Sequence, residues 1–377
     1  MENRFALVIR LTEQATRRIK EDRSLTAPPS IILLTAYGEE GTAAEAIEAG
    51  ADGFLHKPAT ASTLLDAIIG TFGLDAAPQP VADLSYPPDP QRWPPAFPPA
   101  GASAWGDDPY GLWIEVVIGG PVQRLRWIEP GEFLRGSPES EPGRDDDEGP
   151  QHVVRLTEGY WLAETACSQA VWVAVMGGNP SRFKDDPQNP VEQVSWDDVA
   201  GEGGFLRRLE RLLPGLAASL PTEAEWEYAC RAGTETAFNW GSDTITSEQA
   251  NYNASVAYNG GPTGEYRQKT MPVKSFTPNA WGLYQMHGNV WEWCADGMRP
   301  YDGMPQVNPR GETGDGKDAP RVFRGGSWVF PPHGLRAAFR CPGRRDWRDH
   351  DRGFRLLLRS TSPGAERPPE VAGTRDA

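Results

Sequence analysis

The pattern of apolar and polar positions divides the chain into a small part and a large part. In the small part, short apolar runs at 30–34 and 53–55 predict β-strands, and helical spacing of apolar residues predicts helices at 43–49 and 62–69. Gly50 ends the first of these helices. The order strand, helix, strand, helix predicts a small α/β unit.

The large part combines short strands and long loops with few helices. Residues 168–176 predict one helix, and residues 196–213 predict a second one. The apolar face of the second helix consists of Val199, Phe205, Leu206, Leu209, Leu212 and Leu213. Another helix start follows at Thr222, an N-cap residue with Glu225 at the reciprocal capping position. Few helices among long loops predict an α+β fold.

Proline-rich and irregular sequence separates these parts. Residues 75–111 contain too many prolines for a helix or a central strand, so they predict a semi-rigid linker. Residues 360–377 lack apolar periodicity, which predicts a disordered tail. The expected organisation is therefore an α/β segment over 1–74, the linker, a large domain over 112–359 and the tail.

The hydrophobic content indicates a folded protein, and the net charge disfavours some classes of binding partner. Of the 377 residues, 38% are hydrophobic and 14 are Trp, which suffices for a sizeable core, while 36 Pro and 41 Gly indicate irregular backbone. The formal charge of -15 disfavours nucleic acid and anionic lipid as partners. Residues 1–24 show no signal-peptide pattern and no run of 18 apolar residues occurs, so we expect a cytoplasmic protein without a membrane span.

The cysteines, histidines and acidic runs offer no catalytic constellation. Four widely spaced cysteines form no CxxC pair, which predicts reduced and mostly buried thiols at Cys167, Cys230, Cys294 and Cys341. We expect His287 in a loop and His152 on a strand, and neither has a Cys or Asp at nucleophile-base spacing. The acidic run at 145–148 is expected to stay solvated, because neighbouring carboxylates repel one another.

Six strings in the large part follow the order of one family. They are WIEPGEFLRGS at 127–137, NPVEQVSWDDV at 189–199, LPTEAEWEYACRAG at 220–233, PNAWGLYQMHGNVWEWCAD at 278–296, RVFRGGSW at 321–328 and GFRL at 353–356. Together they span about 125–358 and resemble the formylglycine-generating-enzyme (sulfatase-modifying factor) family. The resemblance implies a loop-rich C-type-lectin-type fold.

The small part resembles the second half of a response-regulator receiver domain, over residues of about 8–72. The strings SIILLTAYG and EAGADGFLHKPA carry this resemblance, with Thr35 and Lys57 at the switch-threonine and lysine positions. The acidic pair and the phosphorylatable Asp that a receiver needs are missing. We therefore expect a relic or a partner-docking unit, whose open strand edge favours pairing with another chain or with the large domain.

The residues that would make the large domain a formylglycine-generating enzyme are missing. In that family, two cysteines just after the GGS motif bind Cu(I), which activates oxygen. Phe330 and Leu335 stand at those positions, and Cys341 alone cannot supply a two-thiolate site. Related ergothioneine-type iron oxygenases carry their iron histidines in a separate helical domain, which this sequence lacks. The resemblance therefore implies neither copper nor iron, and a protein that is not an enzyme.

The resemblance also implies structural calcium, a cation that carboxylates, amides and backbone carbonyls bind. The first implied ligand set is Asn251, the Tyr252 carbonyl, Glu265 and the Arg267 carbonyl. The second is Gln285, the Gly288 carbonyl, the Val290 carbonyl and Glu292. Two interpretations of Glu292 stay open, a calcium ligand or an ordinary buried carboxylate, and Gln285 replaces the usual Asn of the family.

Residues 329–352 lie where the family builds its active-site face. In proteins of this fold that a retroelement diversifies, this stretch is the variable region, because AAC codons in the template become NNC when their adenines mutate. Such codons cannot encode Lys, Glu, Gln, Met or Trp. None of the first four occurs in segment 329–352, and Trp347 would be a fixed position. The composition therefore favours diversification.

The same segment interleaves a fixed-looking frame with chemically heterogeneous positions. The frame is Trp328, Pro332, Leu335, Arg336, Ala337, Ala338, Arg340, Arg348, Gly353, Phe354 and Arg355. The heterogeneous positions are Val329, Phe330, Pro331, His333, Gly334, Phe339, Cys341, Gly343, Asp346, Asp349, His350 and Asp351. Phe330, Phe339 and Trp347 would then be exposed aromatic anchors of a binding face. The alternative is that Phe330 and Phe339 belong to the core, beside an ordinary Arg/Asp loop.

The resulting hypothesis is a non-catalytic ligand-binding protein. It would be the variable protein of a diversity-generating retroelement, and its unknown ligand is expected to be a protein. An enzyme of the formylglycine-generating or iron-oxygenase type that uses different residues is the first alternative. A signalling adaptor that docks a partner through the α/β unit is the second.

Overall fold

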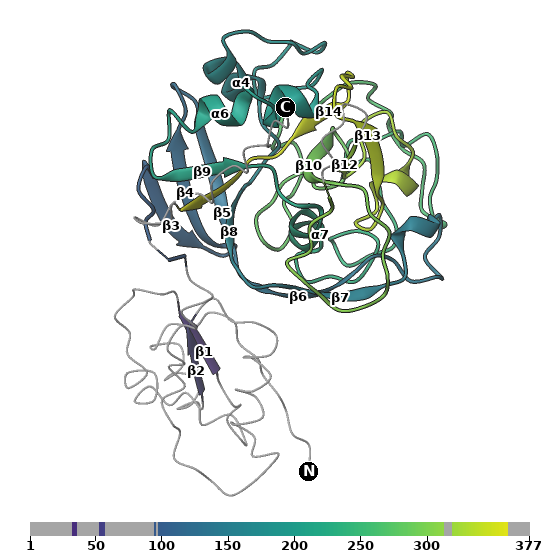
Figure 1. Ribbon diagram of the computed structural model, residues 1–377. Coiled ribbons are helices and arrows are strands. Elements are labelled where there is room, and N and C mark those ends of the chain that lie inside the picture. The colour runs from purple at the N-terminus through teal and green to yellow at the C-terminus, as the bar shows by residue number, and fades with distance from the viewer. Residues whose placement is uncertain (1–31, 36–52, 57–93, 96, 313–318, 361–377) are drawn as a thin grey trace, which may run out of the picture. The chain divides into compact units, whose positions relative to one another are not determined.

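A computed structural model gives the architecture of the chain (Figure 1). It describes residues 32–35, 53–56, 94–95, 97–312 and 319–360. The chain forms two compact units, which are Met1–Pro90 with Asp107–Gly111, and Gln91–Gly106 with Leu112–Ala377. Most of the described residues therefore belong to the second, larger unit.

In the small unit, two strands form a parallel pair. They are β1 (Ile32–Thr35) and β2 (Gly53–His56), with Ile32 opposite Gly53. Both predicted strands are confirmed. The predicted helices at 43–49 and 62–69, and Lys57 at the receiver-type lysine position, lie outside the described residues.

The largest sheet has six strands in the order β3-β4-β5-β8-β15-β9. They are β3 (Ala104–Asp108), β4 (Gly111–Val117), β5 (Val122–Ile128), β8 (Tyr160–Ala163), β15 (Leu357–Ser360) and β9 (Leu216–Ser219). Alternation along β4 buries Ile114 and Val116, as a half-buried strand requires. Strand β3 corrects the predicted linker 75–111, because residues 104–108 pair within this sheet.

The last strand, β15, lies inside this sheet rather than at its edge. Leu357 of β15 pairs with Leu162 of β8 on one side and with Ser219 of β9 on the other. Both pairings are antiparallel. The residues that follow segment 329–352 are therefore central to the fold. The predicted disordered tail begins at the end of β15, and residues 361–377 lie outside the described part of the chain.

Two smaller sheets complete the β structure. A four-stranded sheet has the order β13-β12-β10-β14, and a three-stranded sheet has the order β11-β7-β6. The first consists of β13 (Cys341–Arg344), β12 (Pro320–Arg324), β10 (Trp291–Gly297) and β14 (Arg352–Phe354). The second consists of β11 (Gln306–Val307), β7 (His152–Leu156) and β6 (Gly131–Arg135). His152 lies at the start of β7, as predicted.

The helices follow the capping signals in the sequence, with one exception. Helix α4 (Gln169–Met176) has Ser168 as its N-cap, and α7 (Glu223–Arg231) has the predicted capping box of Thr222 and Glu225. The single helix predicted over 196–213 is wrong. It is split into α5 (Trp196–Ala200) and α6 (Phe205–Leu209), because Gly201, the C-cap of α5, is extended with a ψ of 177° and Gly203 after it has a φ of +70°.

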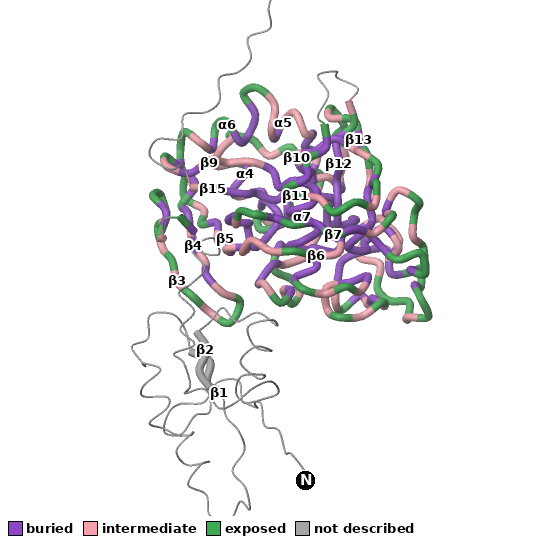
Figure 2. Tube along the Cα trace, turned by 60° about the horizontal axis from the view of Figure 1, so that its bottom comes forward, coloured by how far each residue is buried: buried purple, intermediate pink, exposed green. Residues whose placement is uncertain are grey.

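Three buried apolar clusters hold the large unit together. Figure 2 shows the buried stretches in purple, among them most of β10 and β12 and all of α7. The largest joins Trp161 of the six-stranded sheet to Trp291 and Trp293 of the four-stranded sheet, and Phe205 of α6 packs with them. Sheets with few and short helices confirm the α+β class. Among the described residues, the helices are too short or too polar to cross a membrane.

Candidate functional site

Segment 329–352 is held at both ends by the four-stranded sheet. It follows β12, forms a short 3-10 helix at Pro332–Leu335, continues into β13 and ends at the start of β14 (Figure 1). Strand β13 pairs antiparallel with β12, which places Cys341 opposite Phe323. The pairings of β13 and β14 therefore fix the backbone of the segment toward its C-terminal end, and β12 precedes its start.

The frame predicted from the sequence is buried, with one exception. The buried frame residues are Trp328, Pro332, Leu335, Arg336, Ala337, Ala338, Arg340, Gly353, Phe354 and Arg355. The exception is Arg348, whose side chain is 52% exposed. Burial thus separates most frame positions from most of the chemically heterogeneous positions between them.

The heterogeneous positions divide into eight that are at least partly exposed and four that are buried. The partly or fully exposed ones are Val329, Phe330, Pro331, His333, Cys341, Asp346, Asp349 and His350. The surface role predicted for the buried four is wrong. A Cβ on Gly334 or Gly343 would collide with the ring of Phe330 or Phe323, at 2.5 and 2.3 Å. Asp351 accepts a hydrogen bond from Ser327 Oγ at 2.8 Å, and Phe339 belongs to the core.

Only part of the predicted aromatic anchor set is accessible. Phe339 is buried against Trp291, with ring centroids 5.9 Å apart, so the prediction that it is exposed is wrong. Phe330 is half-buried and meets Trp291 edge to face at 4.9 Å. Trp347 is 44% exposed, with the Arg352 guanidinium 5.3 Å from its ring centroid. The core interpretation therefore holds for Phe339, and Trp347 remains a surface aromatic.

Helix α5 holds the exposed half of the segment through two ion pairs. Arg345 Nε donates to Asp197 Oδ1 at 2.6 Å, and Arg348 donates to both oxygens of Asp198 at 2.6 and 2.7 Å. The ring of Trp196 lies close to two guanidinium groups, at 4.5 Å from Arg321 and 5.1 Å from Arg345. These contacts come from a part of the chain about 150 residues away.

A second group of ion pairs holds the interior half. Arg336 Nη1 donates to Glu141 at 2.6 Å and to Glu148 at 2.7 Å, and all three side chains are buried. Glu148 ends the acidic run at 145–148, so the prediction that this run is solvated is wrong for Glu148. Arg340 donates to both oxygens of Glu223 at 2.6 and 2.8 Å.

Glu223 and Glu227 of α7 join this interior group to the core. Arg135 donates to Glu223 at 2.7 Å, and Arg324 pairs with Glu227. Burial alone would raise the pKa of Glu223, but the guanidinium groups of Arg135, Arg340 and Arg324 outweigh it and lower that pKa to about 2. The buried carboxylates are therefore charged and compensated.

Apolar side chains stand at Phe330 and Leu335, the two positions at which the sequence analysis expects copper ligands in the formylglycine-generating enzymes. Leu335 is fully buried in a cluster with Phe238 and Tyr252, and Phe330 packs against the same cluster. Cys341 is half-buried, and burial raises the pKa of its thiol to about 11. A thiol at that pKa is protonated at neutral pH and is a poor metal ligand.

A Cys-His contact that the sequence analysis missed lies beneath these positions. Cys230 Sγ is 3.7 Å from His287 Nε2, and both residues are buried. His287 Nδ1 donates to the Leu335 carbonyl at 2.6 Å, while Nε2 accepts from Asn239 N at 3.1 Å. Burial lowers the pKa of His287 to about 4 and raises the pKa of Cys230. Because the thiol is protonated and the imidazole is neutral, the pair lacks a nucleophilic thiolate. The two residues are 57 positions apart in the sequence, so only the folded chain shows their contact.

The second implied calcium set does not fit a cation. Both oxygens of Glu292 accept from Arg355, at 2.8 and 3.0 Å, and Oε2 also accepts from Trp226 Nε1 at 2.7 Å. These bonds favour the interpretation of Glu292 as an ordinary buried carboxylate, because a buried guanidinium already compensates its charge. Gln285 Nε2, a donor, is buried without a hydrogen-bond partner among the described residues, which also disfavours a cation there.

The first implied calcium set is divided between two surroundings. Asn251 is buried, and its Oδ1 has no hydrogen-bond partner among the described residues, which suits a cation. Glu265 is 68% exposed and pairs with the Arg267 side chain at 3.3 Å. The described residues contain no group of three His, Cys, Asp or Glu side chains that could hold a metal ion. Asn251 is thus the part of this set that fits calcium.

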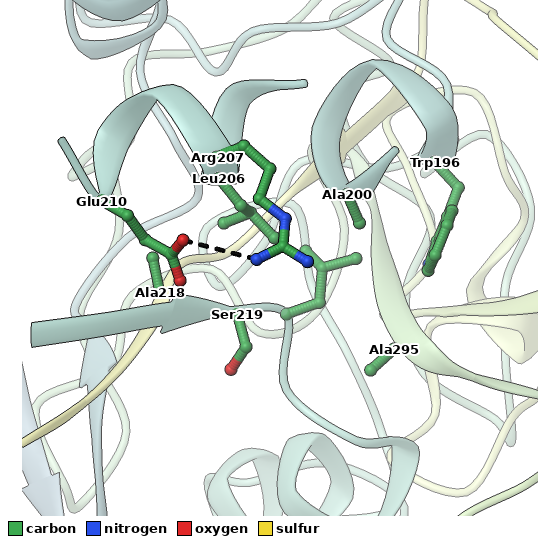
Figure 3. A pocket seen from close by; sticks show the side chains of 9 residues that line it. Trp196, Ala200, Leu206, Arg207, Glu210, Ala218, Ser219 and Ala295 are labelled. Carbon is green, nitrogen blue, oxygen red and sulfur yellow. Dashed lines mark ion pairs between the residues drawn. The ribbon is translucent and has the colours of Figure 1, made fainter. Parts of the chain in front are cut away.

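A separate cavity of about 190 Å³ lies outside segment 329–352 (Figure 3). Its lining consists of Trp196, Ala200, Leu206, Arg207, Glu210, Ala218, Ser219, Leu220 and Ala295. Figure 3 shows Arg207 reaching across it toward Glu210, and the two charges lie 3.5 Å apart. The cavity was not predicted, because its walls come from α5, α6, β9 and β10.

The sheets and this face define a C-type-lectin-type domain of the formylglycine-generating-enzyme kind. The family model of the sulfatase-modifying factor enzyme 1-like domain matches residues 120–360, and the chain belongs to this family. The family resemblance drawn from the six sequence strings is thereby confirmed.

Known proteins of this family include enzymes. The chain is 33% identical over 196 residues to the formylglycine-generating enzyme of Streptomyces coelicolor, covering 47% of this chain and 56% of that protein. It is 39% identical over 159 residues to the hercynine oxygenase of Mycolicibacterium smegmatis, covering 40% of this chain and 35% of that protein. The chain spans about half the length of the first curated relatives it matches.

A solved structure with this fold comes from a variable protein. Treponema denticola variable protein 1 superimposes with a TM-score of 0.54 at 24% identity, covering 66% of this chain and 99% of that chain. This likeness shows the fold, and the predicted C-type-lectin-type architecture is confirmed.

Proposed function

We propose that the chain is a non-catalytic ligand-binding protein that presents segment 329–352 as a diversified face, as the variable protein of a diversity-generating retroelement. The observation that carries this proposal is the division of the segment by burial. Ten of the eleven frame positions are buried, whereas eight of the twelve heterogeneous positions are at least partly exposed. Of those eight, Phe330 and Cys341 also pack against the core, so substitution at the other six changes a surface while leaving the core clusters intact.

The copper-ligand positions support a role other than oxidation. Phe330 and Leu335 pack in apolar clusters, and the thiol of Cys341 is protonated at neutral pH. A protein ligand suits the partly exposed aromatic and charged side chains of the segment, because anchors surrounded by polar groups are typical of protein interfaces. In this proposal the small α/β unit docks a partner of its own.

Sequencing tests the diversification directly. The stretch encoding 329–352 is read from many cells of one natural population, and residues 254–277 serve as a control window of equal length. We expect substitutions to gather at the eight positions that are at least partly exposed and at codons with template adenines. A nearby reverse-transcriptase gene with a near-copy of the stretch should accompany them. Equal variation in both windows, or no near-copy, overturns the proposal.

An activity assay tests the enzyme alternative, which the family's formylglycine-generating enzymes and hercynine oxygenases favour. The chain is loaded with copper and given a cysteine-containing sulfatase peptide. We expect no turnover, and the same result for Cys341→Ala. Oxidation of the peptide above the rate with copper alone would contradict a non-catalytic role, and loss of that oxidation in Cys341→Ala would assign it to the thiol.

A further inference from the structure

Three aromatic rings lie around Trp328, and the four rings together come from three separate parts of the chain. Phe183 lies 5.5 Å from Trp328, His350 5.2 Å and Tyr266 6.3 Å, measured between ring centroids. Trp328 is buried, and the other three rings are half-buried. We call these residues the Trp328 cluster. Since Trp328 precedes segment 329–352 and His350 belongs to it, the cluster lies on the proposed binding face.

A buried carboxylate lies beside this cluster with half of its hydrogen-bonding capacity unused. Glu192 is fully buried, and its Oε1 accepts from the backbone N of Arg182 at 2.6 Å and of Phe183 at 2.8 Å. Its Oε2 is buried and has no hydrogen-bond partner in the described part of the chain. Leaving a buried acceptor unpaired is costly, and leaving a buried charge unpaired costs more.

The charges of His350 and Arg182 near Glu192 offset only part of this cost. Burial raises the pKa of Glu192 against the two backbone hydrogen bonds and against the charge of His350. Within the described residues, Glu192 forms no ion pair, unlike the buried Glu223, Glu227 and Glu292. The Arg182 guanidinium lies 5.4 Å from the ring centroid of Phe183, on an exposed side chain. The aromatic surface therefore already attracts a cation from the chain itself.

We propose that the Trp328 cluster and Glu192 form a subsite for the alkylammonium group of a lysine side chain in the protein ligand. The methylene stem would pack on the rings, and the ammonium group would donate to Glu192 Oε2. Because Oε2 is buried, the ligand reaches it when one of the half-buried rings turns aside. This inference rests on the proposed function, since it places the subsite on the same face.

The test uses the full chain and two small probes that differ mainly in charge. N-acetyl-lysine methylamide carries the ammonium group, and N-acetyl-norleucine methylamide replaces it with a neutral alkyl chain. Binding is followed by tryptophan fluorescence and by NMR line shifts of the probes. We expect the lysine probe to bind about tenfold or more tightly than the norleucine probe, as a charge-assisted hydrogen bond provides.

Two carboxylate variants separate the subsite from general charge. Glu192→Gln should weaken binding of the lysine probe about tenfold or more. Glu265→Gln removes the same charge from an exposed side chain next to Tyr266 and should leave the affinity unchanged. If Glu192→Gln does not fold, Phe183→Leu serves as the second variant, since it removes a half-buried ring and should lower the affinity several-fold.

The outcomes distinguish this subsite from the proposed function. Selective binding of the lysine probe without diversification in the population would leave the subsite standing and remove the retroelement proposal. Diversification without a difference between the probes would remove only the subsite. Equal affinity of the two probes for the unaltered chain, or unchanged lysine binding in both Glu192→Gln and Phe183→Leu, overturns the inference.

Discussion

Two groups of ion pairs hold segment 329–352, and they differ chiefly in their access to water. In the interior half, Arg336 and Arg340 pair with carboxylates that are almost fully buried. In the outer half, Arg344 and Arg348 pair with Asp346 and Asp198 across exposed surface. A buried pair is costly to break, because the remaining partner stays desolvated, whereas a surface pair contributes little. One continuous segment thus contains a rigid half and a tolerant half.

The largest expected effect breaks the interior group. Arg336→Met removes the cation that Glu141 and Glu148 share and leaves two buried carboxylates without it. We expect the free energy of unfolding to fall by about 3–5 kcal/mol, measured by urea denaturation. The matched control is Arg344→Met, which removes an exposed arginine of the same segment. A similar loss in both variants would contradict the comparison.

A smaller effect is expected from a buried carboxyl group, Asp296, whose contribution to stability depends on pH. Burial and the nearby charge of Glu223 raise the pKa of Asp296 to about 7, well above the value near 3.8 expected in the unfolded chain. The folded protein therefore keeps this proton longer than the unfolded chain does, and the contribution of Asp296 to stability falls as pH rises from 4 to 7.

Asp296→Asn should remove this dependence, since an amide keeps the oxygen that accepts from Gly311 N. Relative to the unaltered chain, the variant should be more stable by roughly 1–3 kcal/mol at pH 8 and unchanged at pH 4. Thermal melting at both pH values measures the difference. A gain of equal size at pH 4 would show that the carboxyl is destabilising even when neutral.

Chelation of calcium tests the role of Asn251, a buried residue that forms no ion pair because its side chain is neutral. We propose that Asn251 Oδ1 contributes to a calcium site, because it is buried without a partner among the described residues. EDTA should then lower the stability by about 1 kcal/mol when calcium had been near ten times its Kd, and added calcium should restore it. Asn251→Ala should not respond, whereas Glu292→Gln should still respond. An unchanged melting temperature with EDTA counts against the site.

The smallest expected effect lies in the outer half. Arg348→Ala removes the double hydrogen bond to Asp198 and should cost no more than about 0.5 kcal/mol, decreasing further at high salt. Asp198 Oδ2 still accepts from Ser195 N, and Asp198 N still donates to Ser195 Oγ, so α5 remains capped. If urea denaturation showed that Arg348→Ala lowers the free energy of unfolding by several kcal/mol, the distinction between the two halves would be contradicted.

The fold was predictable wherever local signals agree with the final packing. The predicted N-cap Thr222 and the predicted helix over 168–176 both agree with the structure, and the six strings identified the family. The continuous helix over 196–213 failed because apolar periodicity extends across Gly201 and Gly203, where the backbone leaves helical geometry. Periodicity alone does not register such a break.

The candidate site was harder to predict because its chemistry depends on distant partners. Glu292 and Arg355 are 63 residues apart, so only the folded chain shows that the carboxylate is already paired. Phe339 looked like an exposed anchor among charges, but Trp291 covers it. The Trp328 cluster draws rings from three parts of the chain, and no spacing within one segment predicts that meeting.

Because β15 is an inner strand of the six-stranded sheet, folding of the large unit requires the chain to be translated through β15. Strand β15 is made after segment 329–352, and it joins β8 to β9 in the six-stranded sheet. A stop codon or frameshift within the segment would delete β14 and β15 together, and the sheet would lose an inner strand. Truncated products would then fail to fold and would be degraded, so only chains with an intact reading frame through segment 329–352 would remain as folded protein.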